Sequence, residues 1–198
     1  MTIDLNSSIG MFLGLAIGDA MGAPLEFEKT IRLPNQFVTK YQSGGRHNVS
    51  HGEWTDDTSM AMAMAFAFLE GGFNPHLIME NFLQWKNNGK FSPRGEMFDV
   101  GVTTYKALRE YERDKSNPFK GSQDPMSAGN GGLMRIAAGI LLLKHTGKDS
   151  KPFFDNQEFV LAKGDIFSDS LLLAIVMLFT ILFIPIFESI FGLLTKAR

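Results

Sequence analysis

The sequence contains no cysteine, which excludes disulfide frameworks, thiolate metal sites and cysteine nucleophiles. It also lacks an excess of either charge. Its 19 lysine and arginine residues oppose 21 aspartate and glutamate residues, so no basic field for nucleic-acid binding is expected. No glycine/serine linker and no internal repeat are present. What remains, 44% hydrophobic residues in a chain of 198, is a globular composition for which a cytoplasmic location is the default expectation.

Signals for α-helices dominate the first 147 residues, and no run of alternating apolar and polar residues predicts a strand. The apolar stretch from Ile9 to Met21 carries glycine at every fourth position and lacks the charged start of a signal peptide. Asn74 and Pro75 form a helix start, and Gly71 with Gly72 forms a helix stop. The predicted fold class is all-α, with further helices expected over residues 56–69, 75–88, 97–113 and 133–145.

The last fifty residues differ in character from the rest of the chain. The run from Ser170 to Phe187 contains no charge and, as a helix, would be about 27 Å long, close to the thickness of a bilayer's hydrocarbon core. Two interpretations stand: a buried core helix whose regular length Pro185 limits, or a membrane-anchoring or frame-altered tail. We therefore predict a partial domain over residues 1–147 and an unrelated tail over 148–198, with membrane association through that tail as the alternative to a cytoplasmic chain.

The string from Gly52 to Thr58 is the most informative in the sequence. Its residues Thr55, Asp56 and Asp57 form an all-oxygen cluster, and hard oxygen ligands favour Mg²⁺, Mn²⁺ or Ca²⁺ over zinc or copper. The same residue types also cap helices, because they bind the unpaired N–H groups of a first helical turn. From the residues alone, a metal site and an ordinary cap are equally good interpretations.

A second string places two acids near the end of the first predicted helix. Asp19 interrupts an apolar, glycine-spaced helix, where an ionised carboxylate needs a partner or a cation. We interpret Asp19 as a buried polar latch that bonds to the backbone at a helix end. Glu26 follows Pro24 at the exit of the helix and is better placed to reach a metal.

Two further strings are weaker signals. The glycine-rich turn from Gly129 to Arg135 precedes a helix and exposes backbone N–H groups that can bind phosphate, although a plain turn is the alternative. Asp99 stands at the head of a predicted helix, where an N-cap is the common role. The histidines show no ligand spacing, and we predict that they are solvated: His47, His51, His76 and His145.

In this order, the strings GLAIGDAMGAPLEF, GEWTDDTSMAMA, FDVGVTT and GNGGLMRIAA resemble the ADP-ribosylglycohydrolase family, which includes the dinitrogenase reductase-activating glycohydrolase. The resemblance covers residues 9–143, and its tryptophan-threonine-diaspartate string is highly specific. It implies an all-helical fold that binds two Mg²⁺ or Mn²⁺ ions in a cleft. It also implies hydrolysis of the glycosidic bond between ADP-ribose and a modified side chain, with an ADP-ribosylated protein or ADP-ribose as the partner.

The resemblance also implies roles for individual residues. Thr55, Asp56 and Asp57 match metal ligands, and the implied catalytic acids are Glu26, near the metals, and Asp99, near the ribose. The loop that lies against ADP-ribose matches Gly129, Asn130, Gly131, Gly132, Met134 and Arg135.

One family string is missing from this chain. Family members are longer, and their second half supplies a further metal-binding string of the Gly-Asp-Thr-Asp-Thr type. Asp165 and Asp169 are spaced too far apart to replace it. The sequence therefore predicts an apparently truncated, amino-terminal portion of the domain with an incomplete two-metal site. Besides hydrolysis, a non-catalytic binder of ADP-ribose or metal and a truncated product without function are the alternatives.

Overall fold

The computed structural model describes residues 5–28, 38–122, 124, 127 and 129–146. Within these residues the chain forms α-helices, short 3₁₀-helices and one isolated bridge between Gly44 and Val49, with no strand, so the all-α prediction is confirmed. The predicted tail over 148–198, with its apolar helix at 170–187, lies outside the described residues and stays a prediction. The helices are α1 (Leu5–Gly22), η1 (Ala23–Leu25), α2 (Asp56–Gly71), α3 (Pro75–Asn88), α4 (Val102–Arg113), η4 (Leu133–Arg135) and α5 (Ile136–Thr146).

Capping residues set the ends of α2 and α3, and both helices confirm the predicted bounds closely. Thr55 is the N-cap of α2, which ends at Gly72 with a φ of 65°. Asn74 is the N-cap of α3, where its side-chain oxygen accepts hydrogen bonds from two backbone N–H groups, and Pro75 follows at the first helical position. Gly89 ends α3 in the left-handed conformation that glycine adopts without steric cost.

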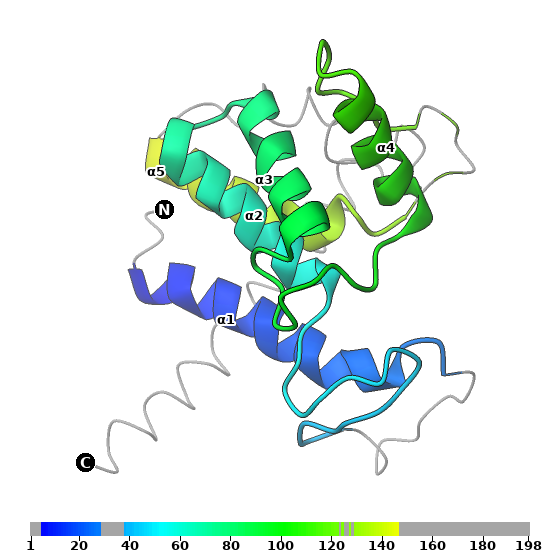
Figure 1. Ribbon diagram of the computed structural model, residues 1–198. Coiled ribbons are helices and arrows are strands. Elements are labelled where there is room, and N and C mark those ends of the chain that lie inside the picture. Colours follow the sequence, from blue (N-terminus) through cyan, green and yellow to red (C-terminus); the bar gives the residue numbers. More distant parts are fainter. Residues whose placement is uncertain (1–4, 29–37, 123, 125–126, 128, 147–198) are drawn as a thin grey trace.

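The hydrophobic core lies where α2 meets α3 and α5, with α4 packed beside α3. Figure 1 shows α2 between α3 and α5, and α1 running below them. The small alanines of α2 let the neighbouring helices approach closely, and its methionines fill the space between them. Large side chains that are fully buried in this core are Met60, Met64, Ile78, Trp85, Leu108 and Tyr111.

Helix α1 is apolar but mostly uncovered within the described residues. Ala20 is its one buried residue, and Phe12 packs against the core. Large apolar side chains at every fourth position are exposed: Leu5 (74%), Ile9 (48%), Leu13 (47%) and Ile17 (37%). Among the described residues, the segment Leu5–Leu25 is the one helix long and apolar enough to cross a membrane, a property shared by core helices and signal sequences.

Two predicted helix boundaries are wrong. Helix α4 begins at Val102 rather than near Met97, because Asp99 adopts a left-handed φ of 54° that no α-helix accommodates. The last predicted helix is divided in two, since residues Leu133–Arg135 form the 3₁₀-turn η4 before α5 begins at Ile136. Both corrections fall beside residues that the sequence marked as candidate site residues.

Candidate functional site

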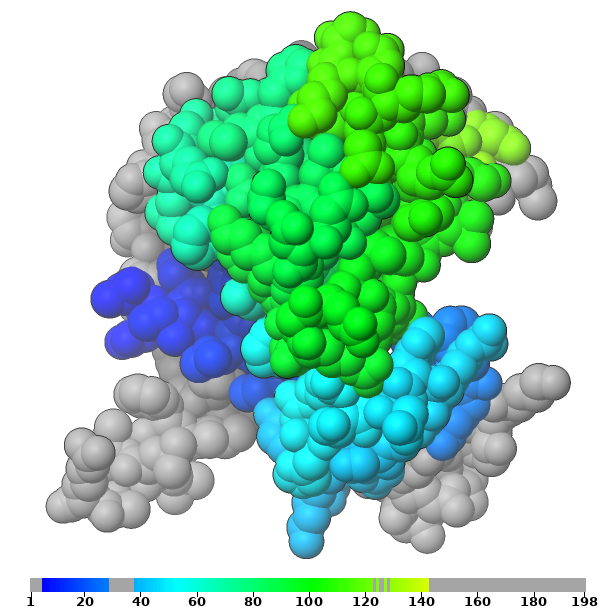
Figure 2. Space-filling model, viewed as in Figure 1, coloured from blue at the N-terminus to red at the C-terminus, as the bar shows by residue number. Residues whose placement is uncertain are grey.

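A cavity of about 600 Å³ lies between the amino-terminal end of α2, the loop before α4 and the glycine-rich loop before η4. The space-filling view in Figure 2 shows the segment around residues 40–50 packed directly beneath the loop that follows α3. Every candidate site residue marked in the sequence, except Thr55, lines this cavity. These residues are Glu26, Asp56, Asp57, Asp99, Gly129, Asn130, Gly131, Gly132, Met134 and Arg135.

Asp19 fastens α1 to the start of α2. Its carboxylate accepts hydrogen bonds from the Thr55 hydroxyl at 2.8 Å and the Thr58 hydroxyl at 2.6 Å. It also accepts bonds from the backbone N–H groups of both threonines at about 3.0 Å. The interpretation of Asp19 as a polar latch at a helix end is thereby confirmed, and the helix end that it binds is that of α2.

The same contacts separate the two interpretations of the threonine-diaspartate string. The buried Thr55 hydroxyl donates to Asp19 and accepts from the Asp57 backbone N–H at 3.5 Å, so it acts as the helix cap. Asp56 and Asp57 instead line the cavity. The string thus contains a cap followed by two cavity-facing acids.

The pKa values of the two aspartates are both raised above the ordinary range. Burial raises the pKa of Asp56 to about 8, and the negative charges of Asp57 and Asp99 contribute to that rise. Burial likewise raises the pKa of Asp57 to about 6, although a hydrogen bond from the Asn130 amide at 3.3 Å opposes the shift. Adjacent buried carboxylates repel one another unless a cation lies between them, and these oxygens fit a divalent ion.

Glu26 and Asp99 bring two more acids to the same wall. Burial raises the pKa of Glu26 to about 8, with the hydrogen bond and the charge of Asp99 as the next causes. The N-cap of α4 is Gly101, without a side-chain bond, so the N-cap interpretation of Asp99 is wrong. The left-handed backbone of Asp99 places its carboxyl group beside Glu26 instead. Such a conformation costs about 1–2 kcal/mol in a residue other than glycine.

His47 is a cavity residue that the sequence pattern did not reveal. Its Nε2 atom is buried and lies 2.9 Å from Asp99 Oδ1 and 3.9 Å from Glu26 Oε2. The prediction that the histidines are solvated is therefore wrong for His47. The local signal was the pair of glycines before it, which marks a tight turn but does not say what the turn faces.

The glycine-rich loop also lines the cavity and contacts the acids. Gly131 passes so close to α4 that a Cβ atom there would lie 3.3 Å from Thr104 Oγ1. Arg135 is buried, and its guanidinium lies 5.1 Å from the centre of the Phe82 ring. Burial lowers the pKa of Arg135 to about 10, while the charges of Asp56 and Asp57 oppose that shift. The loop thus meets the acids through the Asn130 amide, which donates to Asp57, and through the charge of Arg135.

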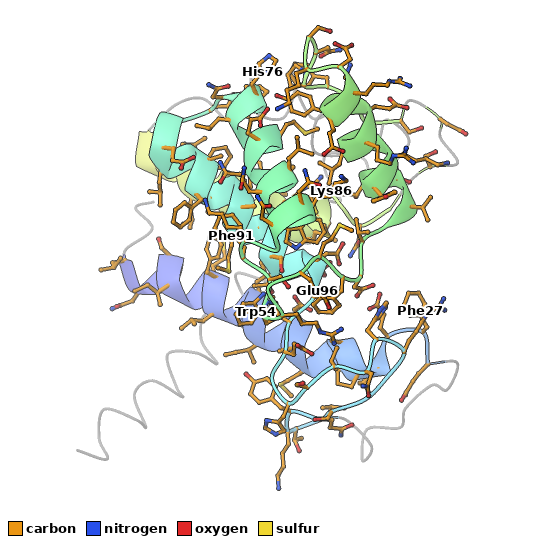
Figure 3. All side chains as sticks on the ribbon, viewed as in Figure 1. Phe27, Trp54, His76, Lys86, Phe91 and Glu96 are labelled. Atoms are coloured by element: carbon orange, nitrogen blue, oxygen red, sulfur yellow. The ribbon has the colours of Figure 1, made fainter. Side chains whose placement is uncertain are left out.

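A second layer of contacts holds the acidic wall in place. The Trp54 indole donates a hydrogen bond to the Phe91 carbonyl at 3.2 Å, and Figure 3 shows these two side chains near one another beside α1. Phe27, labelled in the same view near the end of η1, has a left-handed φ of 64°. Glu26 is thus followed directly in the chain by a residue with a strained backbone.

Comparisons with known proteins agree with this geometry. The family model for ADP-ribosylglycohydrolase matches residues 2–158. The ADP-ribosylarginine hydrolase Tri1 of Pseudomonas putida (strain GB-1) is 36% identical over 143 residues, which are 72% of this chain and 38% of that protein. The ADP-ribosyl-(dinitrogen reductase) glycohydrolase of Rhodospirillum rubrum is 32% identical over 142 residues, 70% of this chain and 45% of that protein.

A solved structure of an ADP-ribosylglycohydrolase-related protein complex aligns with a TM-score of 0.53 and 38% identity, over 68% of this chain and 41% of that chain. The chain spans less than half the length of each of these relatives. The match of the family model over most of the sequence, together with a cavity lined by acids and by a glycine-rich loop, places the chain in the ADP-ribosylglycohydrolase family.

Proposed function

We propose that the chain carries the amino-terminal half of a metal-dependent site for hydrolysis of ADP-ribose glycosidic bonds on modified side chains. The observation that carries the proposal is the cavity itself. It is lined both by Asp56, Asp57, Glu26 and Asp99 and by the glycine-rich loop. The relatives' names, which include an ADP-ribosylarginine hydrolase, favour an ADP-ribosylated protein as the substrate.

The acids and the glycine-rich loop divide the chemistry between them. Asp56 and Asp57, with Glu26 beside them, supply hard oxygen ligands for Mg²⁺ or Mn²⁺. A divalent ion in such a site acidifies a bound water and polarises substrate oxygens. Asp99 lines the same cavity, and we assign to its carboxyl group a hydrogen bond from a ribose hydroxyl. The backbone N–H groups from Gly129 to Gly132 suit the pyrophosphate of ADP-ribose.

A chain that supplies only part of the ligands of a two-metal site would bind ADP-ribose without hydrolysing its conjugates efficiently. Two-metal hydrolysis requires both ions to be fixed, and displacement of the attacking water by about 1 Å costs on the order of 10²-fold in rate. We therefore propose metal-dependent binding of ADP-ribose with hydrolysis near background for the 198-residue chain. Non-catalytic binding is thus the second candidate function, and it rests on the same cavity.

The proposal is tested by calorimetric titration of the 198-residue chain with ADP-ribose, with and without Mg²⁺ or Mn²⁺. We expect binding that requires the metal and that the double variant Asp56→Asn, Asp57→Asn loses. Glu110→Gln, an exposed acid on α4, is the matched control and should bind as the parent does. Binding of equal strength in the absence of metal and in the double variant would overturn the proposal.

Release of ADP-ribose from modified arginine and modified serine substrates gives the second measurement. We expect rates of ADP-ribose release close to those of a control without protein, both in Mg²⁺ and in Mn²⁺. Robust turnover that Asp56→Asn removes would overturn the binding-only view and would assign further metal ligands to residues outside the described part.

A further inference from the structure

His47 sits on a turn that long-range contacts fix against the cavity. The backbone groups of Gly44 and Val49 exchange two hydrogen bonds of 2.8 Å, which closes the turn. Gly45 then lies against Pro24 so closely that a Cβ atom would be 2.4 Å from the Pro24 carbonyl oxygen. Because Pro24 belongs to η1, this contact brings the turn beside Glu26.

Arg94 fixes the other side of the turn to the loop that carries Asp99. Its guanidinium donates to the His47 carbonyl at 3.0 Å and to Glu53 Oε2 at 2.8 Å. The guanidinium carbon lies 3.9 Å from the centre of the Phe98 ring, next to Asp99 in the chain. The backbone of His47 is therefore tied to both acids that its side chain faces.

The imidazole of His47 is held with one nitrogen directed at these acids. Its ring centre lies 6.0 Å from that of Phe27 and 6.4 Å from that of Phe98. The buried Nε2 makes no well-aligned hydrogen bond within the described part of the chain, although Asp99 Oδ1 is 2.9 Å away. The nitrogen and the two carboxylates therefore converge on one point, which is the arrangement of ligand atoms that a cation requires.

We propose that Glu26, His47 and Asp99 form a mixed nitrogen and oxygen cation site that selects first-row transition-metal ions over Mg²⁺. One ligand atom from each residue lies within 4.8 Å of the others. Imidazole nitrogen is a good ligand for transition metals, whereas Mg²⁺ keeps to oxygen ligands and its own waters. The inference deepens the proposed function and rests on it, because it adds a nitrogen ligand to the acidic wall.

Mn²⁺ and Mg²⁺ are the probes, since Mn²⁺ is the first-row transition ion whose preference for oxygen ligands is nearest to that of Mg²⁺, and a difference between the two ions therefore isolates the imidazole. Binding of Mn²⁺ to the metal-free 198-residue chain is measured by electron paramagnetic resonance, and Mg²⁺ is added as competitor. We expect His47→Gln to weaken Mn²⁺ binding by ~10-fold or more while changing Mg²⁺ binding by less than ~2-fold. Spin-echo modulation from a ¹⁴N nucleus should be present in the Mn²⁺-loaded parent and absent in the variant.

Two further variants make the result interpretable. His51→Gln is the matched control, since His51 is exposed, stacks edge-on against Tyr41 and does not line the cavity. His47→Asp keeps a ligand but changes its atom from nitrogen to oxygen. We expect His47→Asp to bind both ions and to lose the preference for Mn²⁺, which holds even if His47→Gln folds poorly.

Three outcomes would overturn the inference. If Mn²⁺ binds the parent without ¹⁴N modulation, His47 is not a ligand, and this result leaves the proposed function intact. Tighter binding of both ions by His47→Gln means that the imidazole only balances the charge of Glu26 and Asp99. Absence of Mn²⁺ binding in the parent overturns this inference together with the metal dependence of the proposed function.

Discussion

Helices α1 and α2 are both apolar, yet they are used in opposite ways. Eight residues of α2 are buried, whereas Ala20 alone is buried in α1. Within the described residues α2 is held by packing, and α1 is held mainly at one end by the hydrogen bonds of Asp19. Within the described part of the chain, α1 is therefore attached through Asp19 and Phe12 rather than through a buried apolar face.

The largest expected effect is a difference in unfolding free energy between a substitution in α2 and one in α1. Met64→Ala, at a fully buried position of α2, should lower the free energy of unfolding by about 3 kcal/mol because it leaves a cavity. Leu13→Ala, on the exposed stripe of α1, should change it by less than about 0.5 kcal/mol. Urea titration measures both. A loss of unfolding free energy in Leu13→Ala as large as in Met64→Ala would show that the apolar face of α1 is covered in the 198-residue chain.

The next effect concerns the amino-terminal end of α2, where the acids cluster. At Mg²⁺ concentrations 100-fold above its dissociation constant, the parent should gain about 2.7 kcal/mol of stability. Asp56→Asn combined with Asp57→Asn should remove this gain, because it removes the charges that hold the ion. Melting temperatures with and without Mg²⁺ test the expectation. The same Mg²⁺ dependence in parent and variant would contradict it.

The attachment of α1 should depend on one carboxylate. Asp19→Ala leaves the buried hydroxyl and N–H of Thr58 without their acceptor, so we expect a loss of about 2 kcal/mol in the free energy of unfolding. Hydrogen exchange should locate the loss at the start of α2. Asn6→Ala, at an exposed position near the other end of α1, gives the comparison, and an equal loss there would argue against a latch at Asp19.

The smallest effect is a pH dependence in the turn that carries His47. The hydrogen bond from Arg94 holds the pKa of Glu53 below its usual value, with the backbone bond of Ser50 acting in the same direction. A lowered pKa means that the folded state releases this proton more readily than the unfolded state. The stability from this pair, about 1 kcal/mol, is present above the ordinary glutamate pKa and is lost as the pH falls through the lowered one. The raised pKa values of Asp56, Asp57 and Glu26 act in the opposite direction. The measurement is therefore the difference in unfolding free energy between the parent and Glu53→Gln, which should shrink as the pH falls from 6 to 3.

Local signals in the sequence were sufficient for α2 and α3. Asn74 and Pro75 specify the start of α3 through capping alone, and the glycines after each helix specify the ends. The start of α4 could not be predicted this way, because Asp99 has a positive φ that ends the helical pattern and that the local sequence does not specify. That conformation depends on neighbours distant in the chain.

The candidate site was predictable in its acids and its glycine loop, because the resemblance fixed their order along the chain. His47 was not predictable, since its position depends on Gly45 meeting Pro24 and on Arg94 binding the turn. Both contacts join segments separated by many residues. The sequence also did not predict that Thr55 caps the helix while the aspartates line the cavity, because capping and metal binding use the same side-chain oxygen atoms.

The left-handed residues of the cavity rim have a consequence for directed evolution. Phe27 and Asp99 both hold a positive φ that glycine would adopt without cost. A library selected only for melting temperature should therefore enrich Phe27→Gly and Asp99→Gly. The first change would loosen the support of Glu26, and the second would delete an acid. Selection for stability and selection for activity are in conflict at these two positions.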